Sequence, residues 1–309
     1  MIVLGGIRSE PALARVADEL SGLGLPFVWF DQRRAAESAC VFRLDDEGLH
    51  GILRDGERSV GLEDVAAVYW RLMDDRLLPE LKGLPADGPE RVHCRSLHET
   101  FLAWIGLTPA RVVNRAAAMA SNGSKPYQAQ LISAAGFEVP ETLVTNDPDL
   151  VRDFLARHRR VVYKSISGTR SVVHEVDADA VARLDDIRWC PVQFQAYVEG
   201  IDVRVHVLGS RVFATRVTSD AADYRYAAVG GGAPARLEAT RLSEAVEARC
   251  VDVTARLGLG FSGIDLRVTP DERVVCFEVN PSPAYTYYEG HTGQPIARAL
   301  AEHLAGVAW

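Results

Sequence analysis

The chain has 309 residues, of which 48% are hydrophobic and 25% are charged, and its formal net charge is −8 at pH 7. This length allows roughly two or three compact lobes, and the composition is that of an ordinary globular protein. The acidic balance argues against a non-specific nucleic-acid binder, and no apolar run is long enough to predict a membrane span. The five cysteines are scattered without a CxxC pair, and the N-terminus starts as a strand without a signal-peptide pattern, so a cytoplasmic location is expected.

Residues 1–110 predict a small α/β lobe. A strand at 2–4, an amphipathic helix at 10–20 and a second strand at 27–30 follow one another in βαβ order. The other elements expected in this lobe are strands at 41–44, 49–54 and 65–69 and a helix at 90–105.

Residues 111–190 predict a second, smaller lobe. Its first part, 114–124, is polar and is expected to be a loop, and a helix at 125–135 then stops at Gly136. The elements expected next are a strand at 142–145, a helix at 148–157 and a strand at 161–164 that leads into the loop 165–171. Residues 191–309 predict an antiparallel sheet with helices at 242–257 and 294–304.

The most informative stretch is 261–281, where two alternating apolar runs flank a turn and predict a β-hairpin. Side chains alternate along a strand, so Asp265, Glu278 and Asn280 are expected on one face. If four residues make the turn, Asp265 faces Cys276 and Glu278 is its diagonal neighbour. No basic residue stands beside Glu278, so a cation between the two carboxylates is expected, and Mg²⁺ suits oxygen ligands of this kind. The alternative is an ordinary acidic hairpin exposed to solvent.

Asp…Glu-x-Asn-Pro closing a hairpin resembles the metal-binding end of the ATP-grasp ligases. The similarity is strongest to the branch that contains the ribosomal-protein glutamate ligases and the peptide-maturing macrocyclases of the microviridin type. It implies an α/β (α+β) ATP-grasp fold: a pre-ATP-grasp domain at 1–110, then two lobes at 111–190 and 191–309 that clamp ATP. It also implies ATP and one or two Mg²⁺ ions, which Mn²⁺ could replace, with Asp265, Glu278 and Asn280 as metal ligands.

Lys125 and Lys164 stand at the places of phosphate-binding lysines in this pattern. Lys164 ends an apolar strand, and a loop of small residues follows it. A lysine can meet phosphate oxygens as a point charge, while N–H groups of such a loop close over them. The resemblance therefore implies nucleotide contacts from Ser167 and Gly168 as well. Relatives often have more glycines in this loop, and Arg170 could replace a backbone contact here.

The hinge between the two ATP-binding lobes is implied at four residues whose backbone would read the adenine edge: Gln195, Ala196, Tyr197 and Val198. The sequence after it resembles the Gly-x-Asp-x-Arg of the family. Asp202 would accept a ribose hydroxyl, and Arg204, on the same strand face, would point to the phosphates or the acyl phosphate. The alternative is a surface Asp–Arg pair on an edge strand.

Arg216 and Arg225 are candidates for holding the substrate carboxylate and the developing charge, because planar guanidinium groups suit carboxylate and phosphate oxygens. The Tyr-Trp-Arg stretch at 69–71 resembles a Tyr/Trp-Arg-Arg stretch of microviridin-type ligases, although Leu72 takes the place of the second arginine. Arg71 could line the acceptor pocket, whereas an aromatic pair at a strand end is more often part of the core.

These residues imply an ATP-dependent carboxylate–amine or carboxylate–hydroxyl ligase that forms an acyl phosphate. A carboxylate-bearing peptide is the expected substrate, joined by amide or ester bonds. The alternatives are a ligase of free amino acids or small amines, and a nucleotide-binding module without catalysis. The module is disfavoured because the three metal ligands and both lysines are present. No nucleic-acid or membrane partner is expected, and formation of a homodimer is left open.

Overall fold

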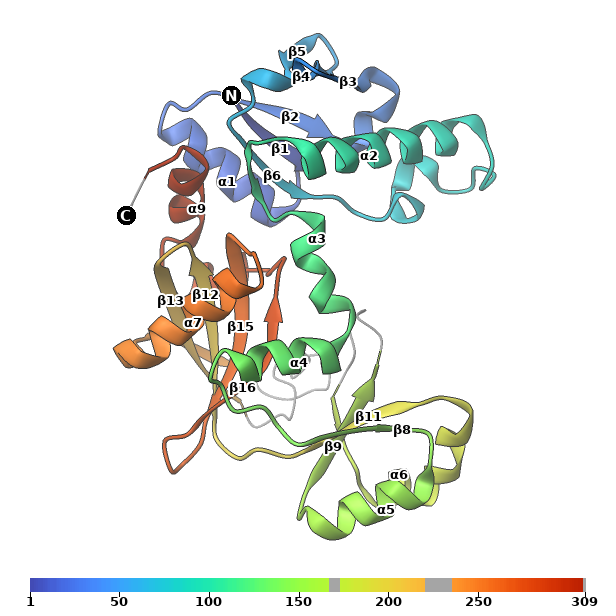
Figure 1. Ribbon diagram of the computed structural model, residues 1–309, viewed down its shortest axis with the longest axis vertical. Helices are drawn as coiled ribbons and strands as arrows, with labels where there is room; N and C mark the ends of the chain where they lie inside the picture. Colours follow the sequence, from blue (N-terminus) through green and yellow to red (C-terminus); the bar gives the residue numbers. More distant parts are fainter. Residues whose placement is uncertain (167–172, 220–234, 308–309) are drawn as a thin grey trace.

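The computed structural model describes residues 1–166, 173–219 and 235–307. Figure 1 shows an N-terminal lobe at one end of the long axis, the sheet of the C-terminal lobe in the middle and the small central lobe at the other end. Within the described residues, helices long and apolar enough to span a membrane are absent.

The N-terminal lobe is built on a parallel sheet whose strands lie in the order β2-β1-β6-β7. Its strands are β1 (Ile2–Gly6), β2 (Phe27–Asp31), β6 (Ala67–Arg71) and β7 (Arg111–Val113). Helix α1 (Pro11–Gly22) packs on one face and helix α2 (Pro89–Leu107) on the other, so β1 is buried along its whole length. The βαβ order expected from the sequence is confirmed.

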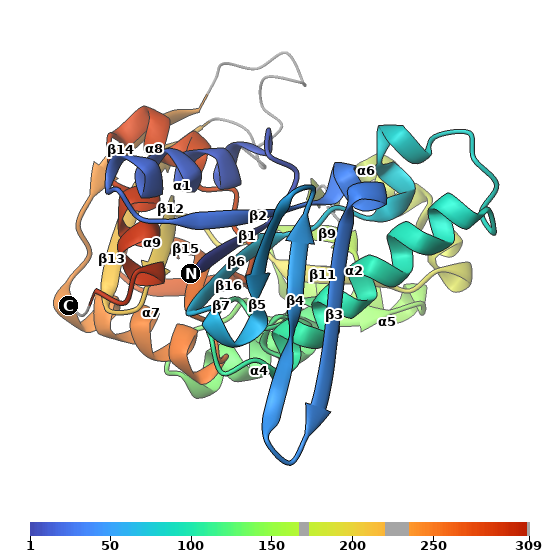
Figure 2. The same ribbon diagram turned by 90° about the horizontal axis from the view of Figure 1, so that it is seen from above.

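A second, antiparallel sheet stands beside β2 and contains a long hairpin that projects from the molecule in Figure 2. Its strands are β3 (Ser38–Asp45), β4 (Gly48–Asp55) and β5 (Arg58–Gly61). Short 3₁₀ helices complete the lobe at Gln32–Glu37, Leu62–Asp64, Asp75–Leu77 and Pro79–Leu81. The short strand β5 was not predicted.

The segment that leads out of this lobe is helical rather than the expected polar loop. Helix α3 (Ala116–Met119) and a 3₁₀ turn (Ala120–Gly123) precede helix α4 (Lys125–Ala134). The expected loop is wrong because the alanine run at 116–120 favours a helix despite the polar residues on either side of it. Helix α4 itself is confirmed, and Gly136 after it has a φ of +84° that suits glycine.

The central lobe has an antiparallel sheet in the order β10-β9-β11-β8. The strands are β8 (Thr142–Thr145), β9 (Val161–Ser165), β10 (His174–Glu175) and β11 (Val192–Ala196). Helices α5 (Pro148–Arg157) and α6 (Ala178–Ala182) and a 3₁₀ segment (Leu184–Trp189) accompany them, and α5 and the 3₁₀ segment share a small core with β9 and β11.

The C-terminal lobe has an antiparallel sheet in the order β14-β13-β12-β15-β16. The strands are β12 (Ile201–Leu208), β13 (Arg211–Thr218), β14 (Arg236–Thr240), β15 (Phe261–Val268) and β16 (Val274–Asn280). Helices α4 and α7 (Glu244–Arg256) cover one face. Helix α9 (Ile296–Leu304) packs on the other face of the sheet and against α1, and this contact joins the C-terminal lobe to the N-terminal lobe. Helix α8 (Thr286–Thr292) was not predicted.

The hairpin β15–β16 forms as predicted, but its register differs. Five residues connect the two strands. Leu266 pairs with Cys276, but the register shifts between Leu266 and Asp265, so that Asp265 pairs directly with Glu278. The expected pairing of Asp265 with Cys276 is therefore wrong. The longer turn closes by hydrogen bonds between Thr269 and Arg273, and the β-bulge adds one residue to β16.

Candidate active site

The acidic residues of the hairpin lie on one face of the C-terminal sheet together with Arg204. Asp265 stands between Glu278 on β16 and Arg204 on β12, each being its direct cross-strand partner. Nη1 of Arg204 lies 2.6 Å from Oδ1 of Asp265, and Arg204 is only 7% exposed. Gly263 leaves the space that its guanidinium fills, since a Cβ at that position would collide with Nη2 of Arg204. The predicted common face is confirmed.

Lys125 reaches the same face from helix α4, which lies along the edge strand β16. Its Nζ is 2.6 Å from Oε1 of Glu278 and 2.7 Å from Oδ1 of Asn122. Three residues further on, the Gln128 amide accepts from the Val279 N–H and donates to the Val279 carbonyl oxygen, which fixes the helix to the edge. The expectation that no basic group stands beside Glu278 is therefore wrong, because the cation comes from another part of the chain.

The donor set on this face fits Mg²⁺. Two carboxylates and the Asn280 carboxamide supply hard oxygen ligands, and Asn280 Oδ1 keeps a second lone pair although it accepts a hydrogen bond from the Ser282 N–H at 2.9 Å. Lys125 and Arg204 balance the two carboxylate charges. A nucleotide whose phosphates attract these two cations would release the carboxylates for the metal.

Asp202 is tied to the hinge through Arg267, a residue that the sequence analysis missed. Arg267 pairs with Asp202 across β12 and β15, with Nη2 at 2.7 Å from Oδ1, and its Nη1 donates to the Val198 carbonyl at 2.8 Å. Its guanidinium also lies 5.6 Å from the ring centroid of Tyr197, whose ring carries Arg160 at 3.6 Å. Side-chain alternation along β15 could have identified this residue, because Arg267 is two residues beyond Asp265 and therefore lies on the same face of the strand.

The predicted hinge lies at the end of β11, and part of its backbone is already hydrogen-bonded within the protein. The N–H groups of Ala196 and Tyr197 donate to the carbonyls of Glu141 and Arg160, and the buried Gln195 side chain donates to Thr142. These two N–H groups are therefore not directed at a ligand.

The remaining predicted residues differ in position. Lys164 is half-buried on β9, directly opposite Gln193 of β11. Arg216 is exposed and pairs with Val203, which places it on the face of the sheet opposite to Arg204. The structure thus does not bring Arg216 to the acidic face. Four predicted residues lie outside the described residues: Ser167, Gly168, Arg170 and Arg225.

Arg71 connects the N-terminal lobe to the loop that follows Asn280. At the end of β6 its Nη1 donates to Ser282 Oγ at 2.9 Å and to the Pro283 carbonyl at 3.1 Å, while its Nε donates to Glu10. Arg71 therefore holds the segment beside the candidate metal ligands instead of standing free in a pocket.

Two titratable groups near the site are held neutral. Burial lowers the pKa of His206 well below its ordinary value, and the neighbouring Arg204 lowers it further. Within the described part of the chain neither ring nitrogen has a hydrogen-bond partner. Burial also raises the pKa of the Cys276 thiol well above its ordinary value. The charges at this face are therefore those of Arg204, Arg267, Lys125 and the carboxylates paired with them.

Residues 123–304 match the family described as the RimK-like ATP-grasp domain, which is more than half of the chain. The chain belongs to the RimK-like ATP-grasp family. The resemblance drawn from the hairpin and the expected ATP-grasp fold are thus confirmed.

The proteins that resemble this RimK-like chain include two named as ligases and one named as a macrocyclase. A "Probable alpha-L-glutamate ligase" of Teredinibacter turnerae is 29% identical over 205 residues, which are 62% of this chain and 66% of that protein. The macrocyclase MdnC from Microcystis aeruginosa, solved with precursor peptide MdnA, has the same fold, with a TM-score of 0.80 and 23% identity over 99% of this chain and 100% of its own. The ATP-grasp ligase PsnB, solved with a minimal precursor, Mg and ADP, is 27% identical over 99% of this chain and 96% of its own, with a TM-score of 0.79.

The side chain of Asn114 connects three segments near the candidate site by hydrogen bonds, and the sequence analysis missed it. Its Nδ2 donates to the carbonyls of Phe261 and Pro281, each at 2.6 Å, and its Oδ1 accepts from the N–H groups of Gly260 and Phe261. The side chain thus joins the end of β7 to the start of β15 and to the residue after Asn280. All partners lie more than a hundred residues away, so no local signal marks it.

We expect Asn114→Ala to destabilise the protein by about 2–4 kcal/mol, because several buried backbone groups lose their partners at once. Urea unfolding followed by circular dichroism would measure the loss. Asn146→Ala is the matched control, since this exposed side chain makes one hydrogen bond at 3.2 Å to the Arg188 carbonyl. Equal midpoints for the two variants would contradict the structural importance of Asn114.

Proposed function

We propose that this protein is an ADP-forming ligase that activates a carboxylate with ATP and transfers the acyl group to an amine or a hydroxyl. The observation that supports this most is the charge arrangement on one sheet face, where Lys125–Glu278 and Asp265–Arg204 form two adjacent ion pairs. Phosphate groups would attract the two cations, and a divalent metal would attract the two carboxylates. The two ion pairs therefore suit a metal-bound triphosphate.

In the proposed reaction, Lys125, Lys164 and Arg204 bind the phosphates, and Asp202, oriented by Arg267, accepts the ribose hydroxyl. Asp265, Glu278 and Asn280 would hold Mg²⁺, which supplies charge neutralisation to the phosphates. A carboxylate oxygen of the substrate attacks the γ-phosphorus, and ADP leaves with the electron pair of the broken P–O bond. The amine or hydroxyl then attacks the acyl carbon and gives up its proton to solvent, and inorganic phosphate leaves with the electron pair of the broken C–O bond. Positioning and electrostatic stabilisation carry most of the catalysis.

We propose a peptide as the substrate, modified by amide or ester bonds in the cytoplasm. The likeness to PsnB and MdnC extends over 99% of this chain and includes the N-terminal lobe, and both were solved with precursor peptides. The second candidate is addition of free amino acids, which is favoured by the name of the Teredinibacter turnerae relative.

The test is a product analysis with purified protein, MgATP and a panel of amino acids, dipeptides and short peptides encoded beside its gene. We expect ADP and phosphate, a hydroxamate when hydroxylamine is added with the correct donor, and the loss of one water per internal link. A condensed peptide product supports the first substrate class, and a free amino-acid adduct supports the second. Detection of AMP would contradict the acyl-phosphate route.

MgATP is expected to raise the melting temperature, since a ligand at about 100 times its Kd stabilises the folded state by about 2.7 kcal/mol. Mg²⁺ alone is expected to have much less effect because Lys125 and Arg204 already neutralise the carboxylates. Differential scanning fluorimetry with Mg²⁺, ATP plus chelator, and MgATP would measure this. Equal shifts with and without the metal would contradict the metal assignment.

A further inference from the structure

Tyr197 lies in the short linker between β11 of the central lobe and β12 of the C-terminal lobe, and its ring contacts an arginine from each lobe. The guanidinium of Arg160, the residue before β9, lies 3.6 Å from the ring centroid, and that of Arg267 on β15 lies 5.6 Å from it. A cation within about 6 Å of an aromatic centroid is attracted to the face of the ring. The ring of Tyr197 therefore joins the two lobes.

The β-bulge of β16 adds a second ring to this arrangement. The extra residue of the bulge is Phe277, which lies between the paired residues Cys276 and Glu278. A bulge redirects a side chain locally, and here the guanidinium of Arg267 lies 5.2 Å from the ring centroid of Phe277. Arginines and rings thus alternate from the start of β9 to the residue before a candidate metal ligand. We call these four side chains the interlobe stack: Arg160, Tyr197, Arg267 and Phe277.

Carboxylates hold the edges of both guanidinium groups. Nε and Nη2 of Arg160 each donate to Glu175 at 2.8 Å, and Nη2 of Arg267 is 2.7 Å from Oδ1 of Asp202. A planar guanidinium binds a carboxylate at its edge while its face remains available to an aromatic ring. The side chain of Arg267 is only 14% exposed, so its contacts with the rings are stronger than those of a fully exposed cation.

The interlobe stack connects the two lobes that carry the groups proposed to bind ATP. Lys164 lies on β9 of the central lobe, whereas Asp202 and Glu278 lie on the C-terminal sheet. One ATP molecule has to contact both lobes at once. A ligand binds more tightly when the groups that contact it are already held in the bound arrangement.

We propose that Tyr197 is a positioning residue of the ATP site, and that its ring fixes the angle between the central and C-terminal lobes before the nucleotide binds. The ring acts through the two arginines and not by contact with the nucleotide. This inference rests on the proposed ligase function, because it concerns the nucleotide of that same reaction.

Calorimetric titration of the full chain with Mg²⁺ and the non-hydrolysable ATP analogue AMPPNP tests the inference. Tyr197→Leu is expected to raise the Kd about tenfold, whereas Tyr197→Phe, which keeps the ring, is expected to stay within about twofold of the native Kd. A native Kd in Tyr197→Leu, or equal weakening in both variants, would overturn the role of the ring alone. Absence of AMPPNP binding by the native protein would overturn the proposed function as well.

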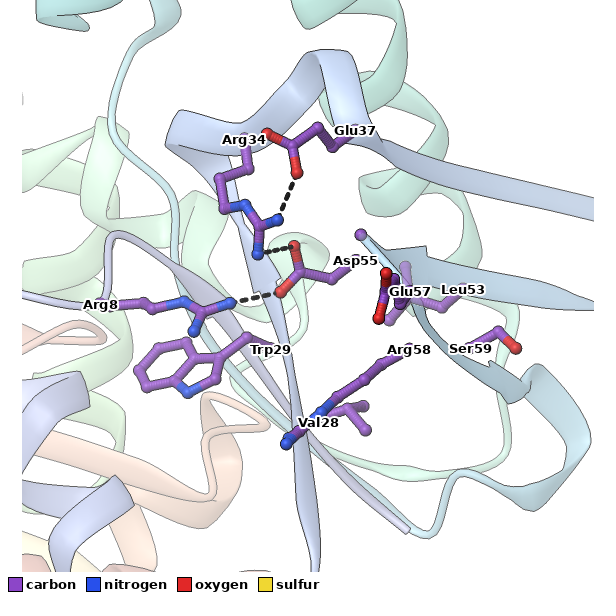
Figure 3. A pocket seen from close by; sticks show the side chains of 11 residues that line it. Arg8, Val28, Trp29, Arg34, Glu37, Leu53, Asp55, Glu57, Arg58 and Ser59 are labelled. Atoms are coloured by element: carbon purple, nitrogen blue, oxygen red, sulfur yellow. Dashed lines mark hydrogen bonds and ion pairs between the residues drawn. The ribbon is translucent and has the colours of Figure 1, made fainter.

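The matched control is the ring of Trp29 in the N-terminal lobe, which Figure 3 shows beside Arg8. The guanidinium of Arg8 lies 5.6 Å from the Trp29 ring centroid, the same distance as Arg267 from Tyr197, but both residues belong to one lobe. Trp29→Leu is therefore expected to leave the Kd for AMPPNP within about twofold of the native value, whatever its melting temperature. A loss of affinity equal to that of Tyr197→Leu would overturn the inference, because general destabilisation would then explain both.

A double-mutant cycle tests whether the ring and Arg160 act together. Arg160→Gln removes the cation that lies closest to the Tyr197 ring within the interlobe stack. We expect the double variant Arg160→Gln/Tyr197→Leu to bind AMPPNP within about twofold of Tyr197→Leu alone, because both changes remove the same contact. Losses of affinity that simply add would overturn the interlobe stack as a unit.

Discussion

Glu278→Gln is expected to reduce ADP formation at least about 1000-fold while the fold survives. The change removes one negative charge from the candidate metal ligands, and the loss of several kcal/mol of charge stabilisation corresponds to such a factor. The carboxamide keeps the shape of the side chain and can still accept from Lys125, whose Nζ lies 2.6 Å from Oε1 in the native protein. Folding should therefore be nearly unaffected.

The matched control for this variant is Glu272→Gln, which removes the same charge from an exposed position in the turn of the same hairpin. We expect it to keep the native rate. A coupled assay for ADP, together with thermal unfolding of each variant, separates a catalytic defect from a folding defect. Turnover of Glu278→Gln close to the native rate would show that this carboxylate does not hold the metal.

Arg204→Met should lower the rate about 100- to 1000-fold, as expected when a preorganised cation is removed from a site of charge development. Arg204 is 7% exposed and is the ion-pair partner of Asp265, so its loss also leaves that carboxylate without its cation. Arg204→Lys should recover part of the rate, because it restores the charge without the planar fork.

Arg216→Met is the informative comparison, since Arg216 was predicted from sequence to contact the substrate but is exposed on the opposite face of the sheet. From this position we expect a change of less than about threefold, because a distant exposed charge is largely screened. Steady-state kinetics with ATP and with the carboxylate substrate would compare the variants. A loss equal to that of Arg204→Met would show that Arg216 reaches the substrate from its strand.

The sequence alone was sufficient for the kind of chemistry and for most of the longer helices and strands, whereas strand β5 and helices α3 and α8 were not predicted. Alternation along β15 and β16 placed Asp265, Glu278 and Asn280 on one face, because the two-residue period of a strand is a local property. Helix α4 was predicted from its own residues and its terminating Gly136. The family resemblance rested on the same short motifs.

Only the tertiary structure decided which charges meet. Lys125 lies 153 residues before Glu278, and Asn114 lies 167 residues before Pro281, so packing of α4 and β7 against the C-terminal sheet creates these contacts. The β-bulge that pairs Asp265 with Glu278 and the pairing of Arg267 with Asp202 depend on strand register, which a single strand does not specify. Sequence periodicity fixes the face on which a side chain lies, whereas its partner depends on how distant elements pack.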